Sequence, residues 1–123
     1  MKIVSTNNAP GAIGPYSQAV IAGGMVYTSG QIAIDPATGN MVEGGVKEQT
    51  EQVCKNVKAL LEASGTSIEK VVKTTCFLAD MADFAVFNEI YAGYFTGKPA
   101  RSCVAAKTLP KGALVEVDTV CLL

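Results

Sequence analysis

Histidine is absent from the 123-residue sequence, and this absence excludes several kinds of catalytic site. Histidine is the most frequent general base, and both Ser-His-Asp and Cys-His catalysis depend on it. Imidazole is also a common metal ligand, and the sequence has no Cys-x-x-Cys pair that could replace it. We therefore expect no metal cofactor.

Cysteines are few, and their positions argue against a disulfide framework. The four lie far apart, in segments predicted to be helix or strand, at Cys54, Cys76, Cys103 and Cys121. Small disulfide-stabilised domains instead carry many closely spaced cysteines in loop-rich segments. We therefore expect buried free thiols.

Long apolar runs and basic clusters are also missing. No segment approaches the roughly 20 apolar residues of a membrane-spanning helix, and "MKIVSTNNAP" at the start lacks the apolar core of a signal peptide. The ten basic and eleven acidic residues are spread along the chain and form no stripe suited to a phosphate backbone. These features predict a cytoplasmic protein without membrane contact, and they weigh against nucleic acid as the main partner.

What the sequence does contain is a high apolar content for its size. Residues 1–123 fit a single domain, and hydrophobic residues make up 49% of them, with a mean hydropathy of +0.29. A small domain has a large surface relative to its volume, so one core can bury only part of this apolar area. Association with other subunits is therefore favoured over the alternative, a tightly packed monomer.

The pattern of apolar and turn residues predicts six strands and two helices in the order βββ-αβ-αββ. The predicted strands span residues 2–5, 16–21, 25–32, 70–79, 100–107 and 114–122. Turns are expected at Gly23-Gly24 and at Asp35–Asn40. One helix is expected over 46–64, with Gly65 ending it, and a second begins at Asp80 or Asp83 and runs to about Phe95. Each helix has an apolar stripe on one face.

Two helices of this length can cover one face of a sheet of about six strands. The fold class is therefore α+β, a mixed six-stranded sheet with both helices on one face. The other face would be left bare, which an apolar chain tolerates when sheets pack against each other in an oligomer.

Arg101, in "KPARSCVAAKTLP", is the only arginine, whereas the other nine basic residues are lysines. One interpretation is an ordinary solvated surface charge. The other is an anion-binding site, because the planar guanidinium can hold a carboxylate or phosphate through two parallel hydrogen bonds and lysine cannot.

Glu116 is the second unusual charge, since it lies inside the apolar run "ALVEVDTVCLL". Alternation places it on the face opposite Val115 and Val117, which is typical of the solvent face of an edge strand. The functional alternative is a carboxylate that positions a water molecule or carries a proton next to a bound substrate. Spacing alone does not show whether its side chain meets that of Arg101.

Three further positions carry open alternatives, and a fourth, Asn88, carries one expectation. Cys103 shares a face with Arg101 and acts as a small buried hydrophobe, through its backbone groups, or as a nucleophile, for which the sequence offers no nearby base. Tyr16 either offers its hydroxyl to a pocket or packs, and Gly30, after Ser29, marks either a bulge or a close approach of a ligand. Asn88 is expected to face solvent on the second helix.

Four segments of the sequence resemble the Rid (YjgF-like) family of imine and enamine deaminases, in the family's order and with compatible spacing. These segments are "NNAPGAIGPYSQAV", "SGQIAIDPATGNMV", "VVKTTCFLADMADFAVFNEIYAGYF" and "PARSCVAAKTLPKGALVEV". The resemblance implies a chorismate-mutase-like α+β fold, assembled as a homotrimer whose sheets form a central barrel, with active sites between subunits. The implied activity is hydrolysis of 2-iminobutanoate and 2-iminopropanoate to 2-oxo acids and ammonia, without a cofactor.

The resemblance also implies roles for individual residues. Arg101 matches the arginine that holds the substrate carboxylate, Glu116 the acidic residue that orients the water, and Cys103 a position whose backbone contacts the ligand. The positions that line the cleft are matched by Tyr16, Ser29, Gly30, Asn88 and Pro110. Two functions of other classes stay open, a regulatory module that binds small carboxylates, and translation inhibition or RNA cleavage.

Overall fold

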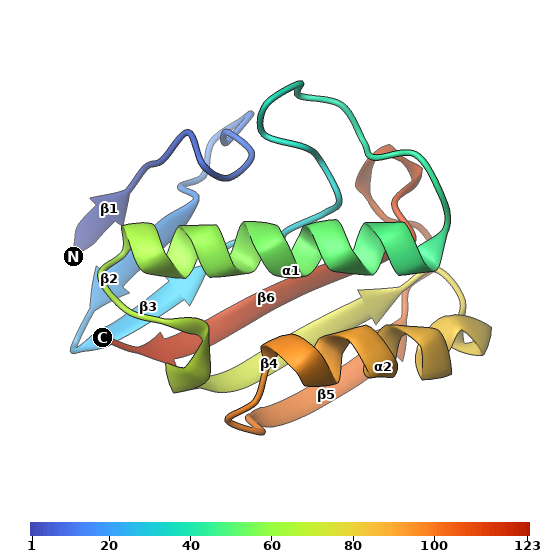
Figure 1. The fold of residues 1–123 in the computed structure, drawn as a ribbon. Coiled ribbons are helices and arrows are strands. Elements are labelled where there is room, and N and C mark those ends of the chain that lie inside the picture. Colours follow the sequence, from blue (N-terminus) through green and yellow to red (C-terminus); the bar gives the residue numbers. More distant parts are fainter.

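The computed structural model describes residues 1–123, and its elements follow the predicted order (Figure 1). The strands are β1 (Lys2–Val4), β2 (Ala19–Ala22), β3 (Met25–Thr28), β4 (Val71–Leu78), β5 (Ala100–Ala105) and β6 (Val115–Leu122). The helices are α1 (Val46–Ala63) and α2 (Phe84–Tyr94), and short 3-10 turns occur at η1 (Ile68–Lys70), η2 (Met81–Asp83) and η3 (Pro110–Gly112). Neither helix has the length and apolar character needed to cross a membrane.

The six strands form one mixed sheet in the order β1-β2-β3-β6-β4-β5, which confirms the predicted fold class. Four neighbouring pairs are antiparallel, and only β4 and β5 run parallel. A parallel pair needs a crossover connection, and α2 supplies it. This crossover places α2 beside β5, the strand that carries Arg101.

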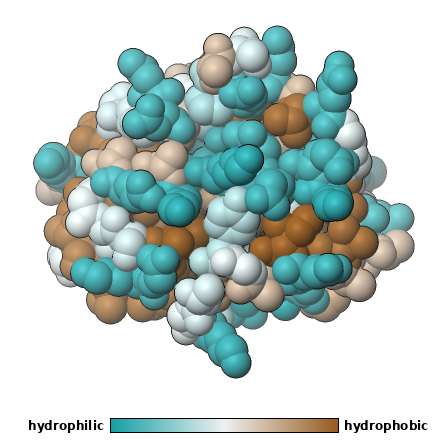
Figure 2. Space-filling model, viewed as in Figure 1, coloured by the Kyte–Doolittle hydropathy of each residue, from teal (hydrophilic) through white to brown (hydrophobic).

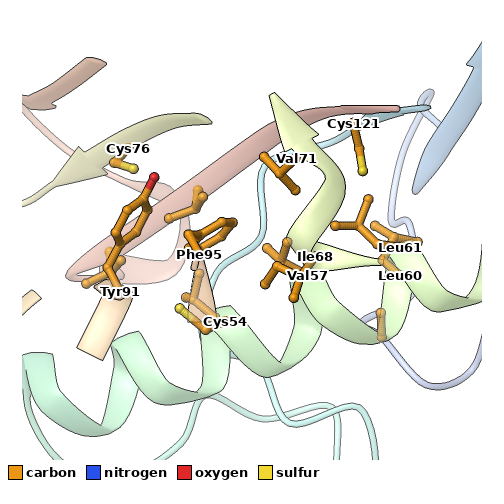
Figure 3. Packing of buried hydrophobic residues seen from close by; sticks show 14 of the residues in the cluster. Cys54, Val57, Leu60, Leu61, Ile68, Val71, Cys76, Tyr91, Phe95 and Cys121 are labelled. Carbon is orange, nitrogen blue, oxygen red and sulfur yellow. The ribbon is translucent and has the colours of Figure 1, made fainter. Parts of the chain in front are cut away.

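Both helices lie on the same face of the sheet (Figure 1). The predicted stripe of α1 is largely buried there, including Val53, Val57, Leu60 and Leu61. Val115 and Val117 of β6 are completely buried beneath the helices, and Figure 3 shows the helix residues packing against Val71 and Cys121 of the sheet. Burial of these side chains, worth about 1.5–3 kcal/mol for each fully buried aliphatic residue, holds the layers together.

Two predicted strand boundaries are wrong by a few residues, each for a local reason. The second strand begins at Ala19 and not at Tyr16, because Gln18 turns inward and binds the preceding loop. The third ends at Thr28, where the ladder with β6 is interrupted. The predicted start of the second helix at Asp80 or Asp83 agrees with the structure, because Asp80 accepts a hydrogen bond from the backbone of Ala82 at the start of η2 and Asp83 is the N-cap residue of α2.

The turn and cap predictions are confirmed by backbone angles. Gly23 and Gly24 both have positive φ, at 58° and 75°, as a tight hairpin turn requires. Gly65 follows Ser64, the C-cap residue of α1, and has φ of 90°, the left-handed conformation that ends helices. The Asp35–Asn40 turn is closed by a hydrogen bond of 2.8 Å from the backbone nitrogen of Gly39 to the carbonyl oxygen of Asp35.

The face of the sheet opposite the helices carries exposed apolar side chains. Ile3, Tyr27, Val104 and Leu122 are between 44% and 61% exposed. By contrast, Figure 2, which views the helix side, shows mostly hydrophilic side chains along α1 and a hydrophobic area at the lower right, beside α2. The apolar content inferred from composition is therefore partly concentrated on the bare sheet face.

All four cysteines are free thiols, as predicted. Cys54, Cys76 and Cys121 are buried, and Cys103 is half-buried. Burial raises the pKa of the Cys76 thiol to about 12, so this group stays protonated at neutral pH. The buried cysteines act as small hydrophobic residues of the core.

Candidate active site

Arg101 is half-buried on β5 and points toward α2. Its Nη1 donates a hydrogen bond of 2.7 Å to Oδ1 of Asn88. Its guanidinium carbon lies 4.8 Å from the ring centroid of Tyr91 and 5.3 Å from that of Phe84. These residues occupy one face of α2 because their spacing of three and four residues matches the helical repeat. Helix α2 therefore holds the guanidinium in place.

The charge of Arg101 is not neutralised by its hydrogen bond, because Asn88 is a neutral amide. A guanidinium has five N–H donors, and this bond uses one of them. The side chain lines a cleft of about 640 Å³ formed by Asn88, Tyr91, Ala92, Phe95, Thr96, Lys98, Pro99 and Arg101. A positive group with free donors in a partly apolar cleft is suited to binding a carboxylate. The expectation that Asn88 merely faces solvent is wrong, since it contacts Arg101 directly.

Five other predicted residues gather in a second cleft, of about 610 Å³. Its lining comprises Pro10, Gly11, Ile13, Tyr16, Gln18, Ser29, Gly30, Gln31, Ile32, Ile34, Pro110, Lys111 and Glu116. The predicted members are Tyr16, Ser29, Gly30, Pro110 and Glu116. Segments that are far apart in the sequence thus meet here, around a single carboxylate.

Glu116 is half-buried on β6, which lies between β3 and β4. The interpretation of Glu116 as a side chain of an edge strand is therefore wrong. Burial raises the pKa of its carboxyl group, and the nearby carboxylate of Asp118 raises it further. Burial favours the neutral form of a carboxyl group, and a neighbouring negative charge does the same. A carboxylate with a raised pKa accepts a proton more readily than an ordinary surface glutamate.

Gly30 lies at a bulge in the ladder between β3 and β6. The last regular pair is Tyr27 with Val120, and pairing resumes at Gln31 with Val117. The chain thus advances four residues after β3 while β6 advances three, so one extra residue bulges out of the ladder. A β-carbon added to Gly30 would lie 2.8 Å from Cδ of Glu116. The bulge predicted as one alternative for this glycine is confirmed, and the group that lies close to it within the chain is the carboxylate of Glu116.

The loop on the other side of this cleft is held by the side chain of Gln18. Its Nε2 donates to the carbonyl oxygens of Thr6 at 3.0 Å and Pro10 at 2.8 Å, and its Oε1 accepts from the Thr6 nitrogen at 2.7 Å. Ser29 Oγ donates to the Ser17 carbonyl oxygen at 2.6 Å, which fixes the neighbouring strand end. Buried amide groups with this many partners rigidify a loop, so the wall that contains Tyr16 is anchored at its base.

Arg101 and Glu116 do not meet within one chain, because they lie on opposite faces of the sheet. Arg101 pairs with Thr74, which is buried under the helices. Glu116 pairs with Phe77 on the neighbouring strand, and Phe77 in turn pairs with Val104 of the bare face. Cross-strand partners share a face and successive residues alternate. One chain therefore contains two separate halves of the predicted site.

Cys103 lies on the helix side with Arg101 but lines neither cleft. Burial raises the pKa of its thiol, and the positive charge of Arg101 offsets part of that rise. A thiol with a raised pKa is a weak nucleophile. The side chain of Cys103 is thus suited to packing and not to covalent catalysis.

The sequence interpretation missed the aromatic surroundings of Arg101. Phe84 and Tyr91 belong to the apolar stripe of the second helix, yet both rings also contact the guanidinium. The available signal was their position on the same helical face as Asn88. Ile32, Ile34 and Lys111 in the second cleft were also missed, since no spacing rule connects them to Glu116.

A family model described as Endoribonuclease L-PSP, which includes the YjgF/Rid proteins, matches residues 6–123. The chain belongs to the Rid family. A human relative named 2-iminobutanoate/2-iminopropanoate deaminase is 48% identical over 122 residues, or 98% of this chain and 89% of the relative. Other relatives carry different names, such as RutC family protein. Membership of the family therefore establishes the fold and relates this Rid protein to imino-acid deaminases.

Two solved structures show how closely this Rid protein keeps the family fold. A putative endoribonuclease from Thermotoga maritima is 48% identical with a TM-score of 0.97, covering 100% of this chain and 98% of that one. TdcF from E. coli, solved with bound serine, is 42% identical with a TM-score of 0.95, covering 100% and 99%.

Proposed function

We propose that this chain hydrolyses small 2-imino acids and their enamine forms, such as 2-iminobutanoate and 2-iminopropanoate, to 2-oxo acids and ammonia. The observation that carries the proposal is Arg101, a cleft-lining guanidinium held by a neutral amide with donors left for a carboxylate. The name of the human relative supports the reaction. The serine bound by TdcF supports the ligand class, since serine also carries a carboxylate next to a nitrogen-bearing carbon.

In the proposed reaction Arg101 binds the substrate carboxylate and Glu116 orients the water. The water oxygen bonds to the imine carbon while Glu116 accepts one proton of the water, and the electrons of the C=N π bond move to nitrogen. Glu116 then returns its proton to nitrogen, the new hydroxyl group gives up the other, and the C–N bond breaks to leave the 2-oxo acid and ammonia. The overall change is R–C(=NH)–COO⁻ plus H₂O to R–CO–COO⁻ plus NH₃. Asn88 supports Arg101, the backbone of Cys103 contacts the ligand, and Tyr16, Ser29, Gly30 and Pro110 line the cleft.

This chemistry is feasible without histidine or a metal-bound water because an imine is already electrophilic. It hydrolyses in water by itself, so the protein needs to supply position and charge more than a strong base. A carboxylate with a raised pKa is sufficient to take the proton from an approaching water.

We propose further that the site is assembled between copies of the chain in a homotrimer. Arg101 and Glu116 lie on opposite sheet faces in one chain, so a second copy is needed to bring them together. The bare face that carries Glu116 is also the apolar face, with Tyr27, Val104 and Leu122 exposed. Covering it in an oligomer would remove apolar area from water. The number three comes from the resemblance to the family.

The direct test generates 2-iminobutanoate from threonine with a threonine dehydratase in the presence of semicarbazide, which traps the imine. Wild-type protein should lower the rate of semicarbazone formation by consuming the imine first. Arg101→Ala should reduce kcat/KM by about 100-fold and Arg101→Lys by at least about tenfold, because lysine keeps the charge but loses the bidentate geometry. Full activity of Arg101→Lys would refute the bidentate role.

Calorimetric measurement of 2-oxobutanoate binding, combined with the imine assay, distinguishes an enzyme from a binding module. A protein that binds 2-oxobutanoate but leaves every tested imine unchanged would be a carboxylate-binding module, and Glu116→Gln would then leave its affinity intact. If the chain is an imine hydrolase, Glu116→Gln should reduce kcat by about 100-fold, the lower range for loss of a general base, while 2-oxobutanoate still binds.

A further inference from the structure

Tyr91 lies behind Arg101 and contacts it with the face of its ring. The guanidinium carbon is 4.8 Å from the ring centroid, within the range of a cation–π interaction. Tyr91 is 8% exposed, so the ring faces the core on one side and Arg101 on the other. The proposed reaction assigns this residue no role.

The hydroxyl of Tyr91 is tied to the sheet. Its Oη shares a hydrogen bond of 2.7 Å with Oγ1 of Thr74, a completely buried residue of β4. Figure 3 shows the Tyr91 hydroxyl extending toward the strand that carries Cys76, two residues further along β4. Thr74 is also the residue paired with Arg101 in the sheet. The hydrogen bond therefore fixes Tyr91 relative to β4, the strand whose backbone also holds the backbone of Arg101 in the sheet.

The ring of Tyr91 also packs against two aromatic rings, one in α2 and one at its C-cap. It stacks on Phe95 with centroids 4.4 Å apart and an angle of 23°, and it contacts Phe87 at 5.4 Å. The ring is thus held at its edge by a hydroxyl bond and on its faces by aromatic neighbours and the guanidinium. A long arginine side chain at an edge strand has many rotamers, and a fixed ring restricts them.

We propose that Thr74 and Tyr91 act together as positioning residues for Arg101. The pair holds the guanidinium over a fixed ring, and Asn88 sets its rotation through the bond to Nη1. The remaining donors then point in a constant direction before any carboxylate arrives. The consequence for activity rests on the proposed role of Arg101, whereas the restriction of its side chain does not.

The competing interpretation is that Tyr91 is only a core residue, and Tyr94 offers a matched control for it. Tyr94 lies one turn further along α2 and donates its hydroxyl to Oε1 of Glu51 at 2.6 Å. It thus makes a comparable bond between elements without contacting Arg101. A general loss of packing should affect variants at both tyrosines, whereas loss of positioning should affect only those at Tyr91.

The single arginine makes a direct measurement feasible. In ¹⁵N-labelled protein the guanidinium Nε–H of Arg101 gives one signal, because no other arginine is present. Tyr91→Leu should lower the order parameter of this Nε–H and speed its exchange with water several-fold, and Tyr91→Phe and Thr74→Val should have smaller effects in the same direction. Tyr94→Leu and Tyr94→Phe should leave the signal unchanged. Equal changes at the two tyrosines would overturn the proposal.

Kinetics and binding provide the second readout. We expect KM for the imine, and Kd for 2-oxobutanoate, to rise about tenfold in Tyr91→Leu and about threefold in Tyr91→Phe, with kcat within about twofold. The Tyr94 variants should match wild type. If wild type hydrolyses no imine, the proposed function fails while the Nε–H measurement still decides the positioning role. If the order parameter of the Arg101 Nε–H stays at its wild-type value in Tyr91→Leu, the positioning role is wrong, whether or not the protein hydrolyses imines.

Discussion

Arg101 differs from the nine lysines in what surrounds its charge. It is half-buried between the rings of Phe84 and Tyr91 and the side-chain amide of Asn88, surroundings that suit a planar guanidinium. A lysine ammonium is more strongly hydrated and cannot stack in the same way. At the scale of single residues, the sequence singled out Arg101 by its type, and the structure adds the aromatic and amide neighbours that distinguish it from the lysines.

Gly30 tests whether the position of the Glu116 carboxylate matters. In Gly30→Ala the new methyl group would occupy space now held by the end of the Glu116 side chain. A flexible side chain can move away, so the free energy of unfolding should change by less than about 1 kcal/mol, whereas kcat should fall by at least about tenfold because the water loses its orienting group. Urea denaturation and imine-hydrolysis assays measure the two effects.

Gly93→Ala is the matched control for this change. Gly93 lies within α2, and a β-carbon added there meets no atom within 4 Å. Alanine is the better helix former by about 1 kcal/mol, so this variant should keep full activity and unfold at slightly higher urea. Equal activity in the Gly30 and Gly93 variants would show that Glu116 tolerates displacement.

Asp118 should control the acid side of the pH–rate profile. Burial and the charge of Asp118 both raise the pKa of Glu116 above its usual value of 4.5. Glu116 must be ionised to accept a proton, so activity should be lost as the pH falls through this raised pKa. Asp118→Asn removes the like charge, lowers the pKa of Glu116 and should move the acid limb to lower pH.

The measurement is kcat/KM as a function of pH, with spontaneous imine hydrolysis subtracted at each point. Asp118→Glu keeps the charge and serves as the control, with an acid limb close to that of wild type. An acid limb that stays in place in Asp118→Asn would mean that Glu116 does not set it.

At the scale of elements, Gln18 connects the N-terminal loop to the sheet. Gln18→Leu leaves the backbone groups of Thr6 and the carbonyl of Pro10 without their partner. Unpaired buried polar groups cost about 1–3 kcal/mol each when water cannot reach them, so we expect a loss of about 2–4 kcal/mol in stability and faster hydrogen exchange at the Thr6 amide. Gln52→Leu, which removes only a bond to Asn56 within α1, should cost less.

Hydrogen exchange followed by NMR distinguishes local from global opening in Gln18→Leu. Exchange should accelerate at Thr6 before it accelerates in the buried amides of β6, because the loop opens while the sheet remains folded. Unchanged protection at Thr6 would show that the loop stays closed without the Gln18 side chain.

Periodicity predicted the existence and order of every helix and strand, because a buried stripe needs the same spacing in any fold. Periodicity failed at the ends of two strands, because tertiary contacts determine where those strands stop. Tyr16 to Gln18 look like strand but form a loop wall, and the strand that begins at Met25 loses its pairing partner at the bulge near Gly30. A side-chain hydrogen bond between residues 12 positions apart, such as Gln18 with Thr6, leaves no periodic pattern in the sequence, and neither does a bulge.

At the scale of the whole molecule, mixing two inactive variants tests whether the site is shared. Arg101→Ala retains Glu116, and Glu116→Gln retains Arg101. If each site takes one residue from each of two copies, a mixed trimer contains one intact site among three. Random mixing of equal amounts should therefore restore about a quarter of wild-type activity by simple counting over a cyclic assembly.

The measurement requires co-refolding or co-expression of the two variants, followed by mass determination of the assembly. Each variant refolded alone is the control and should remain inactive. No recovery in a verified mixed assembly would show that the two residues act within one chain or not at all. A mass equal to one chain under assay conditions would exclude a shared site.

The sequence by itself determined the element order, the fold class, the free thiols and the identity of the charges worth testing. These depend on local periodicity and on residue chemistry, which are present in any single chain. Only the tertiary structure decided that Arg101 lies against α2 on the covered face and Glu116 on the bare face. The physical reason is that a side chain's face and neighbours depend on strand register and crossover. These are set by contacts between residues that are distant in the sequence.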